Sequence, residues 1–456
     1  MLLNTDTIAA IATAQGQAGI GIIRVSGPNT RHIAQVLLGT LPKPRQAHFA
    51  AFLHPDGALL DQGIALFFPS PHSFTGEDIL ELQGHGGAVM LARVLNAVLL
   101  AGARLAEPGE FSKRAFLNDK IDLAQAEAIA DLIACQSEQA AQAAMRSLSG
   151  AFSKAVHDIV DQLTTLRMYV ESAIDFPEEE IDFLADGLIL SRLDQLLDAL
   201  YTLQNKAKQG SVLREGIHVV IAGKPNAGKS SLLNALSGEN SAIVTNIPGN
   251  TRDIVKEHIV CDGIPIHILD TAGLRDSDDL VEQEGIRRTK QALQQADGVL
   301  LMIDATTVTQ SDLIAQIDAM QELVAEKTPI AVLLNKSDLC ADEQHASLLN
   351  TDKQMIYSIS AKTHSGLDQI KKYFKHLAGV TESLEGCFLA RSRHLEAIEQ
   401  AVSAAVRGKE QLLTFKAGEL LAEELRTAQC ALATITGQFS ADDLLGKIFS
   451  NFCIGK

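Results

Sequence analysis

The residues with the clearest chemical meaning form a glycine-rich segment, Gly223 to Ser230, which reads G-K-P-N-A-G-K-S. It follows a short apolar run, Ile217 to Ala222, and precedes a predicted helix at Ser231 to Leu236. A loop between strand and helix can cradle phosphates with its N–H groups, while Lys229 reaches the outer phosphates and Ser230 ligates magnesium. The segment therefore predicts binding of a nucleoside triphosphate with Mg²⁺.

Two further segments at predicted strand ends specify the base. After the apolar run Ile330 to Leu334 the chain reads Asn335-Lys336-Ser337-Asp338, and after Ile356 to Ile359 it reads Ser360-Ala361-Lys362. Open parallel sheets bind ligands at the carboxyl ends of their strands, so both segments are expected beside the phosphate cradle. The carboxylate of Asp338 can accept paired hydrogen bonds from guanine, which adenine does not offer. GTP is therefore the predicted nucleotide.

Two more segments complete the pattern of a GTPase. The predicted strand Ile266 to Leu269 ends in Asp270-Thr271-Ala272-Gly273, which can hold magnesium through water and give a backbone amide to the γ-phosphate. Upstream, Gly249-Asn250-Thr251-Arg252-Asp253 supplies a threonine hydroxyl that can close on magnesium. The order of the five segments is that of translation-factor-like GTPases and predicts a GTP hydrolase. The predicted GTP-binding residues are Asn226, Ala227, Gly228, Lys229, Ser230, Ser231, Thr245, Asn246, Ile247, Pro248, Gly249, Asn250, Thr251, Asp270, Thr271, Ala272, Gly273, Asn335, Lys336, Ser337, Asp338, Ser360, Ala361 and Lys362, with Ser230 and Thr251 as Mg²⁺ ligands.

These segments do not identify the residue that orients the attacking water. Leu274 stands where Ras-type GTPases carry a glutamine, so another side chain has to orient the water. Residue types alone do not choose among the candidates in the acidic stretch downstream, which are Asp276, Asp278, Asp279, Glu282 and Glu284.

Two segments outside the nucleotide site extend the pattern: G-E-F-S-K-R-A-F-L-N at Gly109 to Asn118, and the ending Phe452-Cys453-Ile454-Gly455-Lys456. With them the chain resembles the MnmE family, also called TrmE, of tRNA-modification GTPases from end to end. The resemblance implies that Glu282 orients the water and that a potassium ion supplies the positive charge of an arginine finger. Where the family usually reads G-T-T-R-D, this chain has Asn250, whose side-chain or backbone oxygen can still face the ion. The implied K⁺ ligands are Asn226, Thr245, Ile247 and Asn250.

The resemblance also implies partners and a reaction. A potassium-dependent GTPase of this family works as a homodimer and, in a heterotetramer with an FAD-dependent MnmG-type protein, adds a carboxymethylaminomethyl-type group at C5 of the wobble uridine of certain tRNAs. FAD is expected in the partner, because no G-x-G-x-x-G follows the first strand of this chain. The alternative is a regulatory GTPase switch in ribosome assembly or signalling, and the tail cysteine favours the first hypothesis.

Residues 1–118 mix short apolar runs with Gly and Pro turns, which predicts an α+β domain. In the family this domain resembles the folate-binding module of one-carbon enzymes and mediates dimerisation. From residue types alone, Arg24 and Lys120 are surface charges, Glu81 is a helix-cap carboxylate and His85 is a turn residue. The resemblance instead implies contacts with 5-formyltetrahydrofolate or a related folate at Arg24, Glu81, Lys120 and Lys456.

Helical periodicity begins at Ile121 and returns near His394. The predicted fold is multidomain: an α+β N-terminal domain (1–118), an all-α helical domain in two parts (119–211 and 381–456), and an inserted α/β P-loop GTPase domain (212–380). Two separate helical domains are the alternative. In the second part, Cys453 is by composition a small buried hydrophobe, whereas the resemblance makes it a catalytic thiol that acts on the uridine ring as nucleophile or general acid.

Composition limits the remaining possibilities. Six cysteines without a C-x-x-C pair argue against a disulfide framework or a zinc site and predict a reducing, cytoplasmic location. The stretch Val94 to Ala103 is too short to span a bilayer, so no membrane association is expected. A net charge of −17 weighs against nonspecific nucleic-acid binding, so tRNA is expected to bind to a local basic patch. Two small basic groups are present, one at Lys113, Arg114 and Lys120 and one at Arg391, Arg393 and His394, although groups of this size are more often solvated surface than a binding face.

Overall fold

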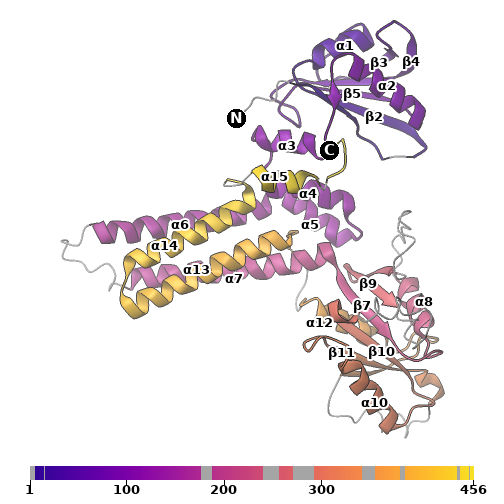
Figure 1. The fold of residues 1–456 in the computed structure, drawn as a ribbon, viewed down its shortest axis with the longest axis vertical. Helices are drawn as coiled ribbons and strands as arrows, with labels where there is room; N and C mark the ends of the chain where they lie inside the picture. The colour runs from indigo at the N-terminus through magenta and orange to yellow at the C-terminus, as the bar shows by residue number, and fades with distance from the viewer. Residues whose placement is uncertain are drawn as a thin grey trace. The chain divides into compact units, whose positions relative to one another are not determined.

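The computed structural model describes residues 6–14, 16–175, 187–239, 256–270, 292–340, 355–380, 386–438, 442–450 and 452–455. The chain forms two compact units. The first consists of Met1–Ala130, Ser147–Leu196 and Ser403–Lys456, and the second of Asp131–Arg146 and Leu197–Val402. Figure 1 labels most of the helices and strands.

The first unit begins with a six-stranded sheet in the order β3-β4-β5-β2-β1-β6. Neighbouring strands are antiparallel except for β1 and β6, which are parallel. The α+β character expected for this region is therefore present. The elements are β1 (Ile8–Ile11), β2 (Ala18–Ser26), α1 (Thr30–Leu38), β3 (His48–Leu53), β4 (Leu59–Phe68), β5 (Ile79–Gly86), α2 (Ala88–Leu100), β6 (Arg104–Leu105) and α3 (Glu110–Leu117).

The two faces of this sheet differ, because side chains alternate along each strand. Ile23 and Val25 of β2 share a core with residues of α1 and α2. On the other face, Ile8 and Ala10 of β1 pack with Phe111 of α3. The part of this second face that α3 does not cover carries exposed side chains. Phe49 of β3 and Ile64 of β4 are register partners there, with 72% and 40% of their surface exposed.

Long amphipathic helices form the rest of the first unit and part of the second. α14 packs along α6. Phe449 of α15 and Phe452, which follows that helix, pack against residues of α3 and α4. Ala124, Ala128, Ile398 and Val402, which the sequence places on apolar faces, are buried. The bounds are α4 (Leu123–Ala134), α5 (Glu138–Leu148), α6 (Ala151–Asp175), α7 (Leu188–Glu215), α13 (Ser392–Phe415), α14 (Gly418–Thr436) and α15 (Asp442–Ser450). None of the helices within the described residues is long and apolar enough to cross a membrane.

The second unit contains another six-stranded sheet, in the order β12-β11-β10-β7-β9-β8. All neighbours are parallel except β8 and β9. Apolar clusters cover both faces, which explains why β10 and β11 are continuous apolar runs. The elements are β7 (Ile217–Ala222), α8 (Lys229–Glu239), β8 (Lys256–Cys261), β9 (Ile264–Asp270), β10 (Gly298–Asp304), α10 (Gln310–Gln321), β11 (Ile330–Asn335), η1 (Ser337–Leu339), β12 (Met355–Ser358) and α12 (Leu367–Leu377).

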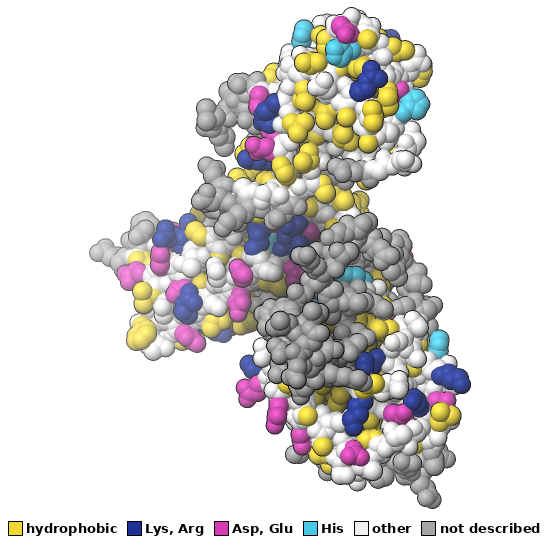
Figure 2. All heavy atoms as spheres, turned by 45° about the vertical axis from the view of Figure 1, so that its right-hand side comes forward, with side chains coloured by type: hydrophobic (Ala, Val, Ile, Leu, Met, Phe, Trp, Pro, Cys, Tyr) yellow, Lys and Arg dark blue, Asp and Glu magenta, His cyan; other side chains and the backbone are white. Residues whose placement is uncertain are grey.

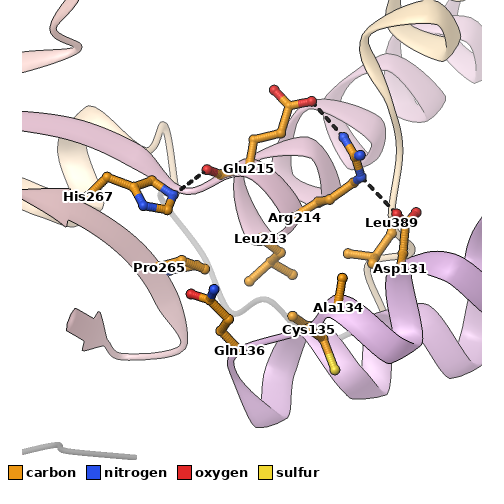
Figure 3. Close-up of a pocket in the computed structure, with 11 residues that line it drawn as sticks. Asp131, Ala134, Cys135, Gln136, Leu213, Arg214, Glu215, Pro265, His267 and Leu389 are labelled. Atoms are coloured by element: carbon orange, nitrogen blue, oxygen red, sulfur yellow. Dashed lines mark hydrogen bonds and ion pairs between the residues drawn. The ribbon is translucent and has the colours of Figure 1, made fainter. Parts of the chain in front are cut away.

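The carboxylate of Asp131 binds both segments that connect this sheet to the helices of its unit. Asp131 accepts hydrogen bonds from Arg214 Nε at 2.9 Å and from Arg391 Nη2 at 2.8 Å. Arg214 ends α7 just before β7, and Arg391 stands just before α13. Glu215 pairs with Arg214 at 2.8 Å, and its carbonyl oxygen is 2.8 Å from His267 Nε2 (Figure 3). Asp131, Arg214, Glu215 and His267 border a pocket of about 180 Å³.

Candidate nucleotide-binding site and C-terminal tail

The segment Gly223 to Ser230 forms the loop between β7 and the N-terminus of α8. Gly223 and Gly228 have positive φ angles of 149° and 103°. A Cβ atom would stand 2.2 Å from the Met302 carbonyl oxygen at the first position and 2.3 Å from Asn335 Nδ2 at the second, so both require glycine. Lys229 Nζ donates to Gly223 O at 2.7 Å, across the mouth of the loop. The loop thus has the backbone path of a phosphate cradle.

Asn335 joins this loop to the segment that follows β12. Its Nδ2 donates to Ala227 O at 2.8 Å, and its Oδ1 accepts from the Ala361 N–H at 3.0 Å. Asn335 is buried, with 3% of its surface exposed. The amide is the side chain that suits this position, because it donates and accepts at once. The first residue of the N-K-x-D segment therefore acts as an internal brace.

Lys336 forms an ion pair with Asp304, the last residue of β10, at 2.5 Å. Thr306 donates to the same carboxylate through its N–H at 3.0 Å and its hydroxyl at 2.6 Å. Burial favours the neutral form of Asp304, but the hydrogen bonds from Lys336 and Thr306 outweigh it and hold the pKa of Asp304 below its usual value. Asp338 follows in η1 with an exposed side chain.

The described segments of the predicted site therefore lie at one edge of the parallel sheet. The loop after β7, the end of β9 at Asp270, the N-K-x-D segment after β11 and Ser360-Ala361-Lys362 after β12 all follow carboxyl ends of strands. Asn226, Ser230, Ser231 and Lys362 are exposed at this edge. Thr245, Asn246, Ile247, Pro248, Gly249, Asn250, Thr251, Thr271, Ala272, Gly273 and the water-orienting candidates, Glu282 among them, lie outside the described residues.

In the first unit, Arg24 and Glu81 are register partners on β2 and β5. Arg24 Nε and Nη2 both lie 2.9 Å from Glu81 Oε1, and the guanidinium carbon is 5.8 Å from the ring centroid of Phe111. Glu81 is therefore a strand residue and not a helix cap, and Arg24 is an ion-paired, half-buried side chain and not a free surface charge. His85, expected in a turn, also lies in β5, where its Nδ1 is 2.7 Å from Asp61. Lys120 is exposed.

The C-terminal tail lies against this site. Gly109 N–H donates to Cys453 O at 3.4 Å, and Arg24 Nη1 donates to Gly455 O at 3.5 Å. Phe452 and Gly455 are buried, whereas Cys453 and Ile454 are exposed. The composition-based expectation of a buried cysteine is therefore wrong, because only one of its two apolar neighbours enters the core. Lys456 lies outside the described residues.

Comparison with known proteins decides the family. The family model "MnmE helical domain" matches residues 123–453, and "GTP-binding protein TrmE N-terminus" matches residues 7–120. The tRNA modification GTPase MnmE of Hydrogenovibrio crunogenus is 57% identical over 99% of this chain and 99% of its own length. That of Shewanella oneidensis is 56% identical over the whole of both chains. The chain belongs to the MnmE family of tRNA modification GTPases.

Family membership confirms the predicted fold class of an α+β N-terminal domain, a helical domain and a P-loop GTPase domain. Among solved structures, Aquifex aeolicus Era bound to GDP.AlF4- matches at 28% identity, with a TM-score of 0.29 over 41% of this chain and 66% of that chain. The MnmE assignment rests on the full-length relatives.

Both basic groups proposed for tRNA contain residues that the fold uses internally. Arg114 is 2% exposed and pairs with Asp6, Glu77 and Glu110. Arg391 pairs with Asp131, and His394 is 2% exposed. Arg114, Arg391 and His394 are therefore engaged in contacts within the fold, which leaves Lys113, Lys120 and Arg393 as the remaining members of the two groups.

Sequence reasoning did not single out three positions whose contacts connect segments that are far apart in this chain. Asp304 could have been found from its place at the end of an apolar run, as Asp338 was. Asp131 and Gly455 had no such signal, because their importance depends on which distant groups lie beside them.

Proposed function

We propose that this chain hydrolyses GTP and uses the cycle to modify tRNA. The observation that supports this most is the convergence of the phosphate loop, Asp270, the N-K-x-D segment and Ser360-Ala361-Lys362 at one sheet edge, within a chain of the MnmE family. The similarity to named tRNA modification GTPases covers the flanking domains as well as the GTPase domain, which favours tRNA modification over a regulatory switch.

In the proposed site each described residue has a limited task. The loop N–H groups and the N-terminus of α8 face the phosphates, and Lys229 exchanges its contact with Gly223 O for the β- and γ-phosphates. Ser230, exposed at the start of α8, suits a Mg²⁺ ligand together with Thr251. Asp338, exposed in η1, receives the guanine, while Asn335 and Asp304 keep the surrounding loops in place. Glu282 orients the attacking water.

A potassium ion suits the phosphate loop because Asn226 has a left-handed backbone, with φ of 63°, and an exposed side chain. This conformation is tolerated by asparagine better than by most residues, and the exposure of the side chain leaves its amide oxygen accessible to the ion. The other proposed ligands are Thr245, Ile247 and Asn250. When bound, the ion supplies positive charge beside the phosphates, where other GTPases use an arginine.

We place a folate, 5-formyltetrahydrofolate or a related compound, on the open face of the N-terminal sheet. Arg24 and Glu81 put a cation and a carboxylate beside exposed apolar strand residues, a combination that suits a flat heterocycle with carboxylates. Lys120 and Lys456 are the other proposed contacts. Cys453, exposed on the adjoining tail, is the proposed catalytic thiol for the uridine ring.

The proposed assembly is a homodimer that joins an FAD-containing MnmG-type partner in a heterotetramer and acts at C5 of the wobble uridine. Figure 2 shows hydrophobic side chains gathered on one face of the N-terminal domain. Exposed Phe49 and Ile64 on that domain's sheet are suited to burial against a second copy. A cytoplasmic location agrees with six cysteines that form no disulfide in the described part of the chain. The proposed domain boundaries are 1–118, 119–211, 212–380 and 381–456.

The decisive experiment is mass analysis of wobble nucleosides in tRNA from cells that lack this protein. Loss of the C5 modification, restored by the wild-type gene and not by Lys229→Ala, is the expected result. Lys229→Ala should fold normally and lose GTP binding, since Lys229 contacts only loop carbonyl oxygens among the described residues. Unchanged wobble nucleosides in the deletion strain would contradict tRNA modification and favour the regulatory switch.

A further inference from the structure

The end of the chain is held by a close backbone contact that only glycine allows. Gly455 is buried and has a φ of 97°. A Cβ atom there would stand 2.3 Å from the carbonyl oxygen of Ile11, the last residue of β1, and 3.2 Å from Ala12 Cα. The Gly455 carbonyl oxygen accepts from Arg24 Nη1 at 3.5 Å. The Cα of Gly455 therefore packs against the backbone of β1, while its carbonyl oxygen faces Arg24 of β2.

A second glycine contact lies two residues back along the tail. Gly109, at the N-terminus of α3, has a φ of 67° and donates its N–H to Cys453 O at 3.4 Å. A Cβ atom on Gly109 would stand 2.6 Å from Phe449 O and 2.9 Å from Phe452 Cβ. The backbone of Cys453 is therefore fixed from both sides, while its side chain is exposed.

The helix that begins after Gly109 is itself anchored by an ion network centred on two buried residues, Glu110 and Arg114. Glu110 accepts from Arg104 at 2.6 Å and from Arg114 at 3.0 Å, and Arg114 also pairs with Asp6 and Glu77. Glu77 in turn accepts from the Ser26 hydroxyl at 2.7 Å, at the end of β2. The G-E-F-S-K-R segment therefore ties α3 to the same two strands that contact the tail.

We infer that Gly455 and Gly109 form a tail latch, which positions Cys453 for its reaction by fixing the backbone on both sides of the thiol. The inference rests on the proposed role of Cys453 in tRNA modification. Gly455 and Gly109 are positioning residues in this scheme, because neither has a side chain that could react. Arg24 contributes through the Gly455 carbonyl, and its ion pair with Glu81 keeps its guanidinium in place.

The first test measures the tail directly. Gly455→Ala places a methyl group against the carbonyl oxygen of Ile11, and Gly109→Ala places one against the carbonyl oxygen of Phe449. Either substitution should therefore release the tail. Hydrogen exchange at the Gly109 amide and in the peptide containing residues 452–455 should accelerate by roughly tenfold in both variants. Gly446→Ala is the matched control, since nothing lies within 4 Å of its Cβ position in α15. Unchanged exchange in Gly455→Ala would overturn the latch.

The second test asks whether the latch serves the reaction. Wobble-uridine modification by the reconstituted full-length protein should fall by about ten- to a hundredfold in Gly455→Ala and Gly109→Ala, because a displaced reactive group loses most of its rate. GTP hydrolysis and the thermal unfolding of the GTPase domain should stay at wild-type values, which excludes general misfolding. Wild-type modification by a variant with a released tail would overturn the positioning role.

Cys453→Ser separates this inference from the proposed function. If Cys453→Ser modifies tRNA fully, the catalytic role of the thiol fails and the positioning role fails with it. If Cys453→Ser is inactive while Gly455→Ala releases the tail and remains active, the proposed function stands and the latch alone is wrong. Inactivity in both, with faster exchange only in the glycine variants, supports the latch.

Discussion

At the scale of single residues, the proposed site divides into side chains that meet the nucleotide and side chains that hold other residues. Asp338 and Ser230 are exposed, whereas Asn335 is buried with both ends of its amide hydrogen-bonded. An exposed carboxylate at a strand end is available to a ligand. Substitutions of the two kinds should therefore differ, with affinity changing in the first and stability in the second.

Asp338→Asn should lower GTP affinity without unfolding the protein. The substitution exchanges a charged acceptor pair for an amide, which costs about 1.5–3 kcal/mol per hydrogen bond and therefore at least about tenfold in affinity. Xanthine nucleotides should then bind better than GTP, because their 2-oxo group accepts where guanine donates. Titration with fluorescent nucleotides measures this, and an unchanged GTP affinity would move base recognition away from Asp338.

Glu110→Gln should destabilise the N-terminal domain by about 2–3 kcal/mol, since it removes the charge that compensates Arg104 and buried Arg114. Burial favours the neutral form of Glu110, yet the hydrogen bonds from Arg104, the Glu107 N–H and Arg114 hold its pKa below the usual 4.5. A lowered pKa stabilises the fold above the unfolded-state value, and this contribution is lost as the pH falls.

The difference in stability between wild type and Glu110→Gln should therefore be largest near about pH 6 and shrink below about pH 4.5. Thermal unfolding across this pH range provides the measurement. Glu423→Gln is the control, because Glu423 pairs with Arg426 on the surface and both side chains are more than half exposed. A difference that grows at low pH would mean that the Glu110 carboxylate does not stabilise the fold.

At the scale of elements, loops and linkers are held together by a few buried polar groups. Asn335 connects the loop after β7 with the segment after β12, and Asp131 on α4 binds the end of α7 and the start of α13. In each case one side chain fixes two segments that are far apart in sequence. Loss of such a group should affect both segments together.

Asn335→Ala should lower the stability of the GTPase domain by about 2–4 kcal/mol, because it leaves the Ala227 carbonyl and the Ala361 N–H without their buried partner. GTP affinity should fall as well, since both loops border the proposed nucleotide site. Asn335→Asp keeps the acceptor for Ala361 and should be less severe. Denaturant unfolding with and without GTP tests this, and a fully stable Asn335→Ala would show that the brace is unnecessary.

Asp131→Ala should loosen both linkers of the inserted domain and destabilise the second unit by about 2–4 kcal/mol, because Asp131 is a buried carboxylate with two arginine partners. Protease cleavage of the segment 386–391 should accelerate in parallel. The comparison is Asp158→Ala, whose partner Lys154 is exposed, and which should behave as wild type. Equal cleavage rates in Asp131→Ala and wild type would show that the linkers are held by other contacts.

At the scale of the whole molecule, hydrolysis is proposed to require two GTPase domains that meet face to face across a homodimer. Leu274 cannot orient water, and the acidic candidates follow it along the chain. The reaction should therefore depend on the ion and on protein concentration as well as on single side chains.

GTP hydrolysis should be faster in potassium than in sodium, and Glu282→Ala should keep GTP binding while losing most turnover, as expected of a residue that acts only in the transition state. Steady-state rates in the two salts at matched ionic strength provide the measurement. Equal rates would remove the ion from the mechanism, and an active Glu282→Ala would return the water-orienting role to Asp278, Asp279 or Glu284.

Local patterns of the sequence were sufficient for the parallel strands of the GTPase domain and the residues at their ends. The predicted strand Ile217 to Ala222 is β7, and the runs beginning at Ile330 and Ile356 are β11 and β12 within one residue at each end. This works because a strand covered on both faces is a continuous apolar run, and because ligand residues in such sheets follow the carboxyl ends.

Contacts between residues far apart in sequence were decided only by the tertiary structure. Arg114 reads as a surface cation, yet it is buried and pairs with Asp6, Glu77 and Glu110. Cys453 reads as a buried hydrophobe, yet its side chain is exposed. The need for glycine at residue 455 arises only from its close contact with the backbone of Ile11, which the sequence does not reveal. The sequence determines which chemistry each residue can do, whereas burial, pairing and backbone approach depend on neighbours that only the folded chain brings together.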